Sequence, residues 1–155
     1  MNYIGLEKKG TNELSEKLNN LLASYQIHYQ NLRGLHWNIQ GTNFFELHVK
    51  YEELYTRTQV VIDDIAERIL TLGHRPLHTF TDYLSHSSIK ELPTTSDGHA
   101  GMEYLLNAQK DLLVLERDIL ELSGEVNDEG TNSMISDLIR EKEKDSWMFR
   151  SWLSK

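Results

Sequence analysis

The chain of 155 residues contains no cysteine and only two prolines. Without cysteine it has no disulfide, no zinc–thiolate site and no thiol catalysis. The shortage of proline, together with 39% hydrophobic residues, favours a helical globular fold over a disordered or fibrous one. This length is enough for one domain with its own core. We therefore predict a single domain over residues 1–155, in which residues 1–10 form a short N-terminal arm that could be flexible.

Long hydrophobic runs and basic residues are also scarce. No stretch has the length needed to cross a membrane, and the first residues, MNYIGLEKKG, lack the apolar core of a signal peptide. The expectation is a cytoplasmic protein with no membrane partner. Lysine and arginine number 16 against 24 aspartates and glutamates, which gives a net charge of −8. This charge disfavours nucleic-acid binding through the general field and would attract metal cations.

What the sequence does contain is apolar residues at helical spacing in four long segments. Thr11 or Asn12 is the predicted cap of the first helix, and Asn43 with Glu46 resembles a capping box that opens the second. Ser96 or Asp97 caps the third, and acidic, glycine-flanked residues separate it from the fourth. The predicted ranges are about 12–40, 44–72, 98–123 and 131–152.

One long connection, residues 73–96, joins the second helix to the third. A connection of this length is unusual unless it carries structure of its own, and Phe80, Tyr83 and Leu84 predict one short helix within it. The other links are short. Two short links and one long crossover are the connectivity of a ferritin-like four-helix bundle, so the predicted fold is all-α.

Five residues between positions 35 and 72 have the chemistry of metal ligands: His36, His48, Glu52, Asp63 and Glu67. Glu52 lies four residues after His48, and Glu67 four after Asp63, so each pair shares one helix face. His48 and Asp63 are only about 60° apart around the helix axis. The four residues of the second helix therefore point broadly to one side. Imidazole and carboxylate ligands without thiolate suit iron.

These ligands cannot all meet within one straight helix, because His48 and Asp63 are roughly 22 Å apart along its axis. Either the residues are unrelated, or the histidine half of one subunit meets the carboxylate half of another across a two-fold interface. A metal site inside one bundle is disfavoured. Such sites use Glu-x-x-His on two helices, and no histidine here has an acidic residue three positions before it.

Each candidate also has an ordinary structural interpretation. His36 at a helix end is compatible with a hydrogen-bonded core histidine, and His48 beside Glu52 with a surface pair. The two downstream carboxylates fit a solvated helix face, and Trp37 fits simple packing. Periodicity alone leaves a helical bundle in which a metal site is an open question.

Three runs, LHWNIQG, FFELH and DDIAERIL, together with the late segment WMFRSWL, resemble the Dps family (DNA-binding protein from starved cells), the mini-ferritins. The resemblance extends from about residue 14 to residue 153. It implies a hollow dodecamer of four-helix subunits, built from two-fold dimers, with a two-iron ferroxidase site at each dimer interface. It further implies that one subunit supplies the ligands His36, His48 and Glu52, and that its partner supplies Asp63 and Glu67. Relatives often have aspartate at the position of Glu52.

The function implied by this resemblance is iron sequestration. Fe(II) would be oxidised, preferably by hydrogen peroxide, and stored as ferric mineral inside the shell, which protects the cell and its DNA from oxidative stress. Trp37 would lie beside the irons and take up oxidising equivalents. Glu125, Asp128 and Glu129 match the acidic region through which iron enters related shells, although Ser133 replaces an acidic residue of some relatives. The alternative is a DNA-compacting or purely structural shell with little ferroxidase activity.

Members of this family that bind DNA generally use a tail rich in lysine or arginine. The N-terminus here offers only Lys8 and Lys9, partly offset by Glu7, and the sequence ends at Lys155 without a basic tail. Each arm would neutralise few phosphates, and its binding would be sensitive to salt. The prediction is weak or absent DNA binding.

Overall fold

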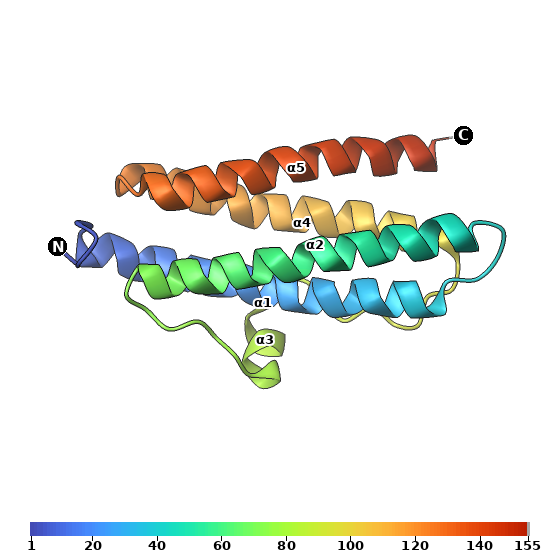
Figure 1. Cartoon of the computed structure of the whole chain (residues 1–155), viewed down its shortest axis with the longest axis horizontal. Coiled ribbons are helices and arrows are strands. Elements are labelled where there is room, and N and C mark those ends of the chain that lie inside the picture. Colours follow the sequence, from blue (N-terminus) through green and yellow to red (C-terminus); the bar gives the residue numbers. More distant parts are fainter. Residues whose placement is uncertain (155) are drawn as a thin grey trace.

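The computed structural model of the chain describes residues 1–154 and contains five helices and no strand in that range. Four long helices lie side by side, and the short one flanks the bundle next to α1 (Figure 1). No helix in the described range is long and apolar enough to span a membrane. The all-α fold and the short crossover helix are thus confirmed. The helices are α1 (Lys8–Asn38), α2 (Phe44–Thr71), α3 (Phe80–His86), α4 (Gly98–Glu125) and α5 (Glu129–Leu153).

Two helices begin upstream of their predicted starts. Helix α1 begins at Lys8 rather than after Thr11, whose hydroxyl donates to the Lys8 carbonyl at 3.0 Å inside the first turn. Helix α5 begins two residues before the predicted Thr131, because Asp128 accepts a hydrogen bond from the Thr131 N–H at 3.0 Å and caps the helix. In both cases the predicted boundary was a threonine that is buried inside the helix, and the helix begins before it.

Of the capping predictions for the other two helices, one is confirmed and one is wrong. Asp97 caps α4 as expected and accepts the Ala100 N–H at 2.7 Å. Asn43 precedes α2, but its side chain makes no capping bond, so the predicted capping box does not form. The Glu46 carboxylate instead accepts the indole N–H of Trp152 at 3.2 Å, which joins the start of α2 to the end of α5.

The N-terminal arm is shorter than predicted and is held against the end of α2. Positions 8–10 already belong to α1. The Tyr3 hydroxyl donates to the Thr71 carbonyl at 2.5 Å, and the Asn2 amide donates to the Leu72 carbonyl at 3.4 Å. These bonds satisfy carbonyls at the C-terminal end of α2 that have no partner within the helix. Residues 2 and 3 are therefore part of the packed structure.

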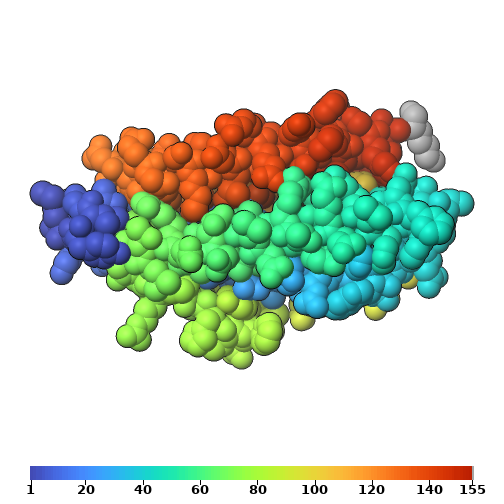
Figure 2. Space-filling model, viewed as in Figure 1, coloured from blue at the N-terminus to red at the C-terminus, as the bar shows by residue number. Residues whose placement is uncertain are grey.

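Two apolar clusters fill the bundle. Most apolar residues at helical spacing in the long helices are buried in them, and others are partly buried. Figure 2 shows the face formed by α2 and α5, with α3 projecting at its edge. The cluster nearer the link between α1 and α2 supports the backbone around His36 and His48; it comprises Leu32, Leu35, Ile39, Leu47, Tyr51, Leu54, Met102, Leu105 and Phe149.

An ion pair is buried inside the bundle. Lys142 donates to Glu116 at 2.9 Å, and the Tyr25 hydroxyl donates to the same carboxylate oxygen at 2.6 Å. Glu116 is fully buried, and its second carboxylate oxygen has no hydrogen-bond partner. Burial raises the pKa of Glu116, while Lys142 and the Tyr25 hydrogen bond lower it. The Lys142 ammonium thus opposes the effect of burial, which on balance leaves the pKa of Glu116 above its ordinary value.

The crossover is fastened to α1 by Asn31. Its amide donates to the Lys90 carbonyl at 2.9 Å and to the Tyr104 hydroxyl at 2.8 Å, and it accepts the Leu92 N–H at 2.9 Å. His28 lies 3.0 Å from the same tyrosine oxygen, and burial lowers its pKa to about 3. His28 is therefore a neutral core histidine, and it takes no part in the candidate site.

Candidate functional site

His36 and His48 meet across the link between α1 and α2. Their rings stack with centroids 3.8 Å apart and an interplanar angle of 17°. The chain reverses between them at Gly41, whose φ of +98° is a conformation that glycine adopts without strain. The tight reversal brings the last turn of α1 against the second turn of α2. Two histidines twelve residues apart thereby become neighbours.

The backbone fixes how each ring is protonated. His36 Nδ1 lies 2.7 Å from the His48 carbonyl oxygen, and His48 Nδ1 lies 2.9 Å from the His36 carbonyl oxygen. A carbonyl only accepts, so each Nδ1 carries the hydrogen and donates it. In the neutral ring Nε2 then holds the lone pair. Histidines oriented in this way by a carbonyl are typical metal ligands.

Aromatic rings hold the histidine pair in place. Phe44 stacks on His48 at 5.0 Å, and the edge of Tyr55 meets His36 at 5.3 Å. His36 is only 8% exposed, and His48 is half-buried. Burial raises the pKa of the Tyr55 hydroxyl, and the nearby Glu52 carboxylate raises it further. The histidines thus occupy a rigid site that opens toward the surface on the His48 side.

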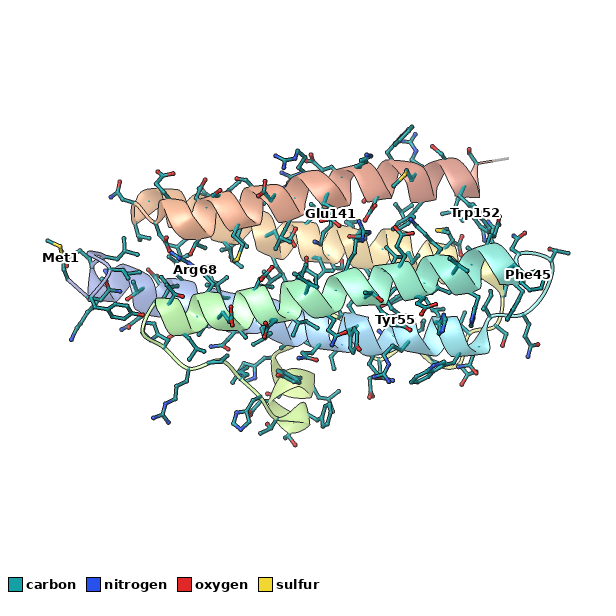
Figure 3. The ribbon with its side chains drawn as sticks, in the orientation of Figure 1. Met1, Phe45, Tyr55, Arg68, Glu141 and Trp152 are labelled. Carbon is teal, nitrogen blue, oxygen red and sulfur yellow. The ribbon has the colours of Figure 1, made fainter. Side chains whose placement is uncertain are left out.

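The three carboxylates Glu52, Asp63 and Glu67 lie on the exposed face of α2. None of them forms an ion pair within residues 1–154. Figure 3 labels Phe45 and Arg68 near opposite ends of α2. His48 lies about one turn after Phe45, and Glu67 directly precedes Arg68. The structure therefore shows the long separation that helical geometry predicted.

One subunit alone does not gather a metal site. In the part of the chain that the structure describes, no three histidines, aspartates or glutamates lie close enough to hold one ion. His36 and His48 are brought together, whereas Asp63 and Glu67 stay two-thirds of the way along α2 or further. The arrangement offers two half-sites on one chain.

Trp37 is 58% exposed, so it does not pack into the core. The Arg33 guanidinium lies over its ring at 4.7 Å and over the Tyr29 ring at 5.4 Å. Tyr29 in turn meets Tyr55 edge-on at 6.1 Å. Sequence reasoning missed these two tyrosines. The available indication was spacing, because Tyr29 is seven residues before His36 and Tyr55 is seven after His48.

Comparison with known proteins identifies the family of the chain. Residues 15–155 match the family model of the ferritin-like domain. A Dps protein from Vibrio cholerae O1 has the same structure, with a TM-score of 0.98 and 52% identity over 99% of this chain and 97% of that one. This chain belongs to the Dps family. The DNA protection during starvation protein of Porphyromonas gingivalis is 35% identical over 97% of this chain and 95% of its own, and that of Bacillus anthracis (protein 2) is 34% identical over 92% and 97%.

In this Dps chain the three predicted pore residues have different environments. Glu125 and Glu129 are exposed, on either side of the turn between α4 and α5. Asp128 is 2% exposed and pairs with Arg68 at 2.5 Å, besides capping α5 through Thr131. Both of its oxygens accept hydrogen bonds within the subunit. Within the subunit Asp128 therefore caps α5 and pairs with Arg68.

Proposed function

We propose that this Dps protein is a cytoplasmic ferroxidase that oxidises Fe(II) at sites shared by two subunits and stores the ferric product in a hollow shell. The observation that carries the proposal is the stacked pair His36–His48, with each Nδ1 bonded to a carbonyl and each Nε2 left to bind metal. The Vibrio cholerae relative is described as a member of a broad superfamily of ferritin-like diiron-carboxylate proteins, which supports iron as the metal.

The proposed site combines two copies of the chain. A two-fold axis that sets two α2 helices antiparallel would bring His36, His48 and Glu52 of one copy to Asp63 and Glu67 of the other. Each dimer would then carry two identical sites. We propose that six such dimers close into a dodecamer. Twelve chains at a net charge of −8 carry roughly −96, a field that draws in Fe(II). Glu125 and Glu129 are the candidate pore carboxylates.

In the proposed reaction the protein binds and positions two Fe(II) ions as substrate. The histidine nitrogens and the carboxylates hold the ions close together, and the carboxylates offset their charge. Hydrogen peroxide takes one electron from each iron and two protons, and yields two water molecules. Two irons per site thus supply both electrons, so that no hydroxyl radical is released. Glu52 has a longer side chain than the aspartate that relatives often have at this position.

The first prediction is rapid oxidation of Fe(II) by hydrogen peroxide. The purified shell is loaded anaerobically with two Fe(II) per subunit, and peroxide is added while ferric absorbance is recorded. We expect a fast phase that consumes one peroxide per two irons, and a slower reaction when dioxygen replaces peroxide. An absorbance trace identical to that of Fe(II) in buffer alone would reject the proposed activity, and would favour the alternative of a structural or DNA-compacting shell.

The second prediction concerns DNA. Lys8 and Lys9 lie in the first turn of α1, and the residues before them are held against α2 through Asn2 and Tyr3, so residues 1–10 do not form a free basic arm. The protein is expected not to retard duplex DNA in a gel shift at about 0.15 M salt, where exposed charges are strongly screened. A variant with five lysines added before Met1 is the matched control and should retard it. Retention of DNA by the unmodified protein at this salt would contradict the prediction.

A further inference from the structure

The two histidine rings are the start of a chain of aromatic contacts. Two other rings touch the pair, Phe44 against His48 and Tyr55 against His36. Of these only Tyr55 is a phenol, and a phenol gives up an electron far more readily than a benzyl ring. The next ring outward is Tyr29, whose centroid is 6.1 Å from that of Tyr55. Tyr55 is therefore the nearest phenol that could donate an electron to an oxidant at the histidine pair.

Trp37 is adjacent to His36 in sequence, yet its environment opposes its oxidation. Indole first becomes a radical cation when it loses an electron. The Arg33 guanidinium lies 4.7 Å over the ring, and a second positive charge at that distance is repelled. The same guanidinium lies over Tyr29 at 5.4 Å. Its charge also acts on Tyr55, but among the described residues no cation lies over the Tyr55 ring. The structure thus favours electron loss from Tyr55 over loss from Trp37.

We infer that Tyr55 is the side chain that supplies an electron when peroxide meets a site holding a single Fe(II). This inference rests on the proposed ferroxidase function. A lone iron gives one of the two electrons that peroxide requires, and the alternative product is hydroxyl radical. Tyr55 gives the second electron. Its hydroxyl proton and one proton from solvent complete the two water molecules, leaving Fe(III) and a neutral tyrosyl radical.

The test is electron paramagnetic resonance on the intact shell. Fe(II) is limited to one ion per site, peroxide is added anaerobically, and samples are frozen within the first turnover. The wild-type protein is expected to give a tyrosyl signal that narrows when its tyrosines carry ring deuterium. Tyr55→Phe should lose this signal, whereas Trp37→Phe should keep it. Tyr51→Phe is the matched control, because Tyr51 lies one turn earlier on α2, is buried, and its hydroxyl has no partner.

Ferric absorbance at two irons per site is recorded in parallel and separates the two levels of the proposal. Absence of peroxide-dependent absorbance in the wild type rejects the ferroxidase function, and this inference with it. Normal iron oxidation with a tryptophanyl signal, or with no protein radical, rejects Tyr55 alone. Survival of the tyrosyl signal in Tyr55→Phe does the same. If that variant fails to assemble, deuterated wild-type protein and Trp37→Phe still decide whether the radical is on tyrosine or on tryptophan.

Discussion

Two inactive variants of this protein should restore activity to each other when their subunits are mixed. One variant carries His36→Gln and His48→Gln, and the other carries Asp63→Asn and Glu67→Gln. Each alone lacks one half of every proposed site and is expected to lose the fast peroxide-dependent phase. A mixed dimer keeps one complete site, built from the intact histidines of one subunit and the intact carboxylates of the other.

The size of the recovery follows from random pairing. In an equal mixture, half of the sites receive their histidines from the variant that keeps them. Independently, half of the sites receive their carboxylates from the variant that keeps those. The expected recovery is therefore about a quarter of the wild-type rate, since each two-fold interface carries two independent sites. The variants are unfolded together, refolded and assayed as a shell, and each variant refolded alone is the control. Sites formed within single subunits would give a mixture no faster than its two parents.

Much of this architecture could be read from the sequence because it follows from local periodicity. Apolar spacing near 3.5 residues placed the long helices, and the length of residues 73–96 placed the crossover with its short helix. The helix starts were less accurate. Thr11 and Thr131 have the side chains of capping residues, but both are buried within the first turn of their helices. The choice between a cap and a first-turn residue depends on packing that the local sequence does not encode.

The candidate site was predictable to a similar extent. The 15-residue separation of His48 and Asp63 on α2 already showed that they cannot hold one metal ion within one helix, and left either unrelated residues or a site shared by two copies of the chain. The stacking of His36 on His48 depends on how sharply the chain reverses at Gly41, and this emerges only in three dimensions. The contacts of Asp128 were likewise not predictable from the sequence. The resemblance to the Dps family placed Asp128 in an acidic pore region, and the structure adds that within the subunit its carboxylate pairs with Arg68 and caps α5.

Removing the buried ammonium with Lys142→Met is expected to cost about 3–5 kcal/mol of stability at pH 8, because it leaves the Glu116 carboxylate buried without its cation. The loss should be smaller at low pH. Burial raises the pKa of Glu116 and Lys142 opposes that effect, so the variant's pKa is raised further. Below the raised pKa the side chain is neutral in the folded protein, and the penalty of a buried charge is absent. In the unfolded chain Glu116 ionises at its ordinary pKa. As the pH rises through the raised pKa of the folded variant, the free energy of unfolding therefore falls.

The double variant Glu116→Gln with Lys142→Met separates charge from packing. Its amide still accepts the Tyr25 hydroxyl, carries no charge, and should recover most of the lost stability with no dependence on pH between 5 and 8. Urea unfolding followed by circular dichroism, at one fixed protein concentration, measures all three proteins, since assembly makes stability depend on concentration. A single variant that loses equal stability at pH 5 and pH 8 would show that Lys142 stabilises the bundle through its packing against the Tyr25 ring, which lies 4.7 Å from the ammonium, rather than by neutralising Glu116.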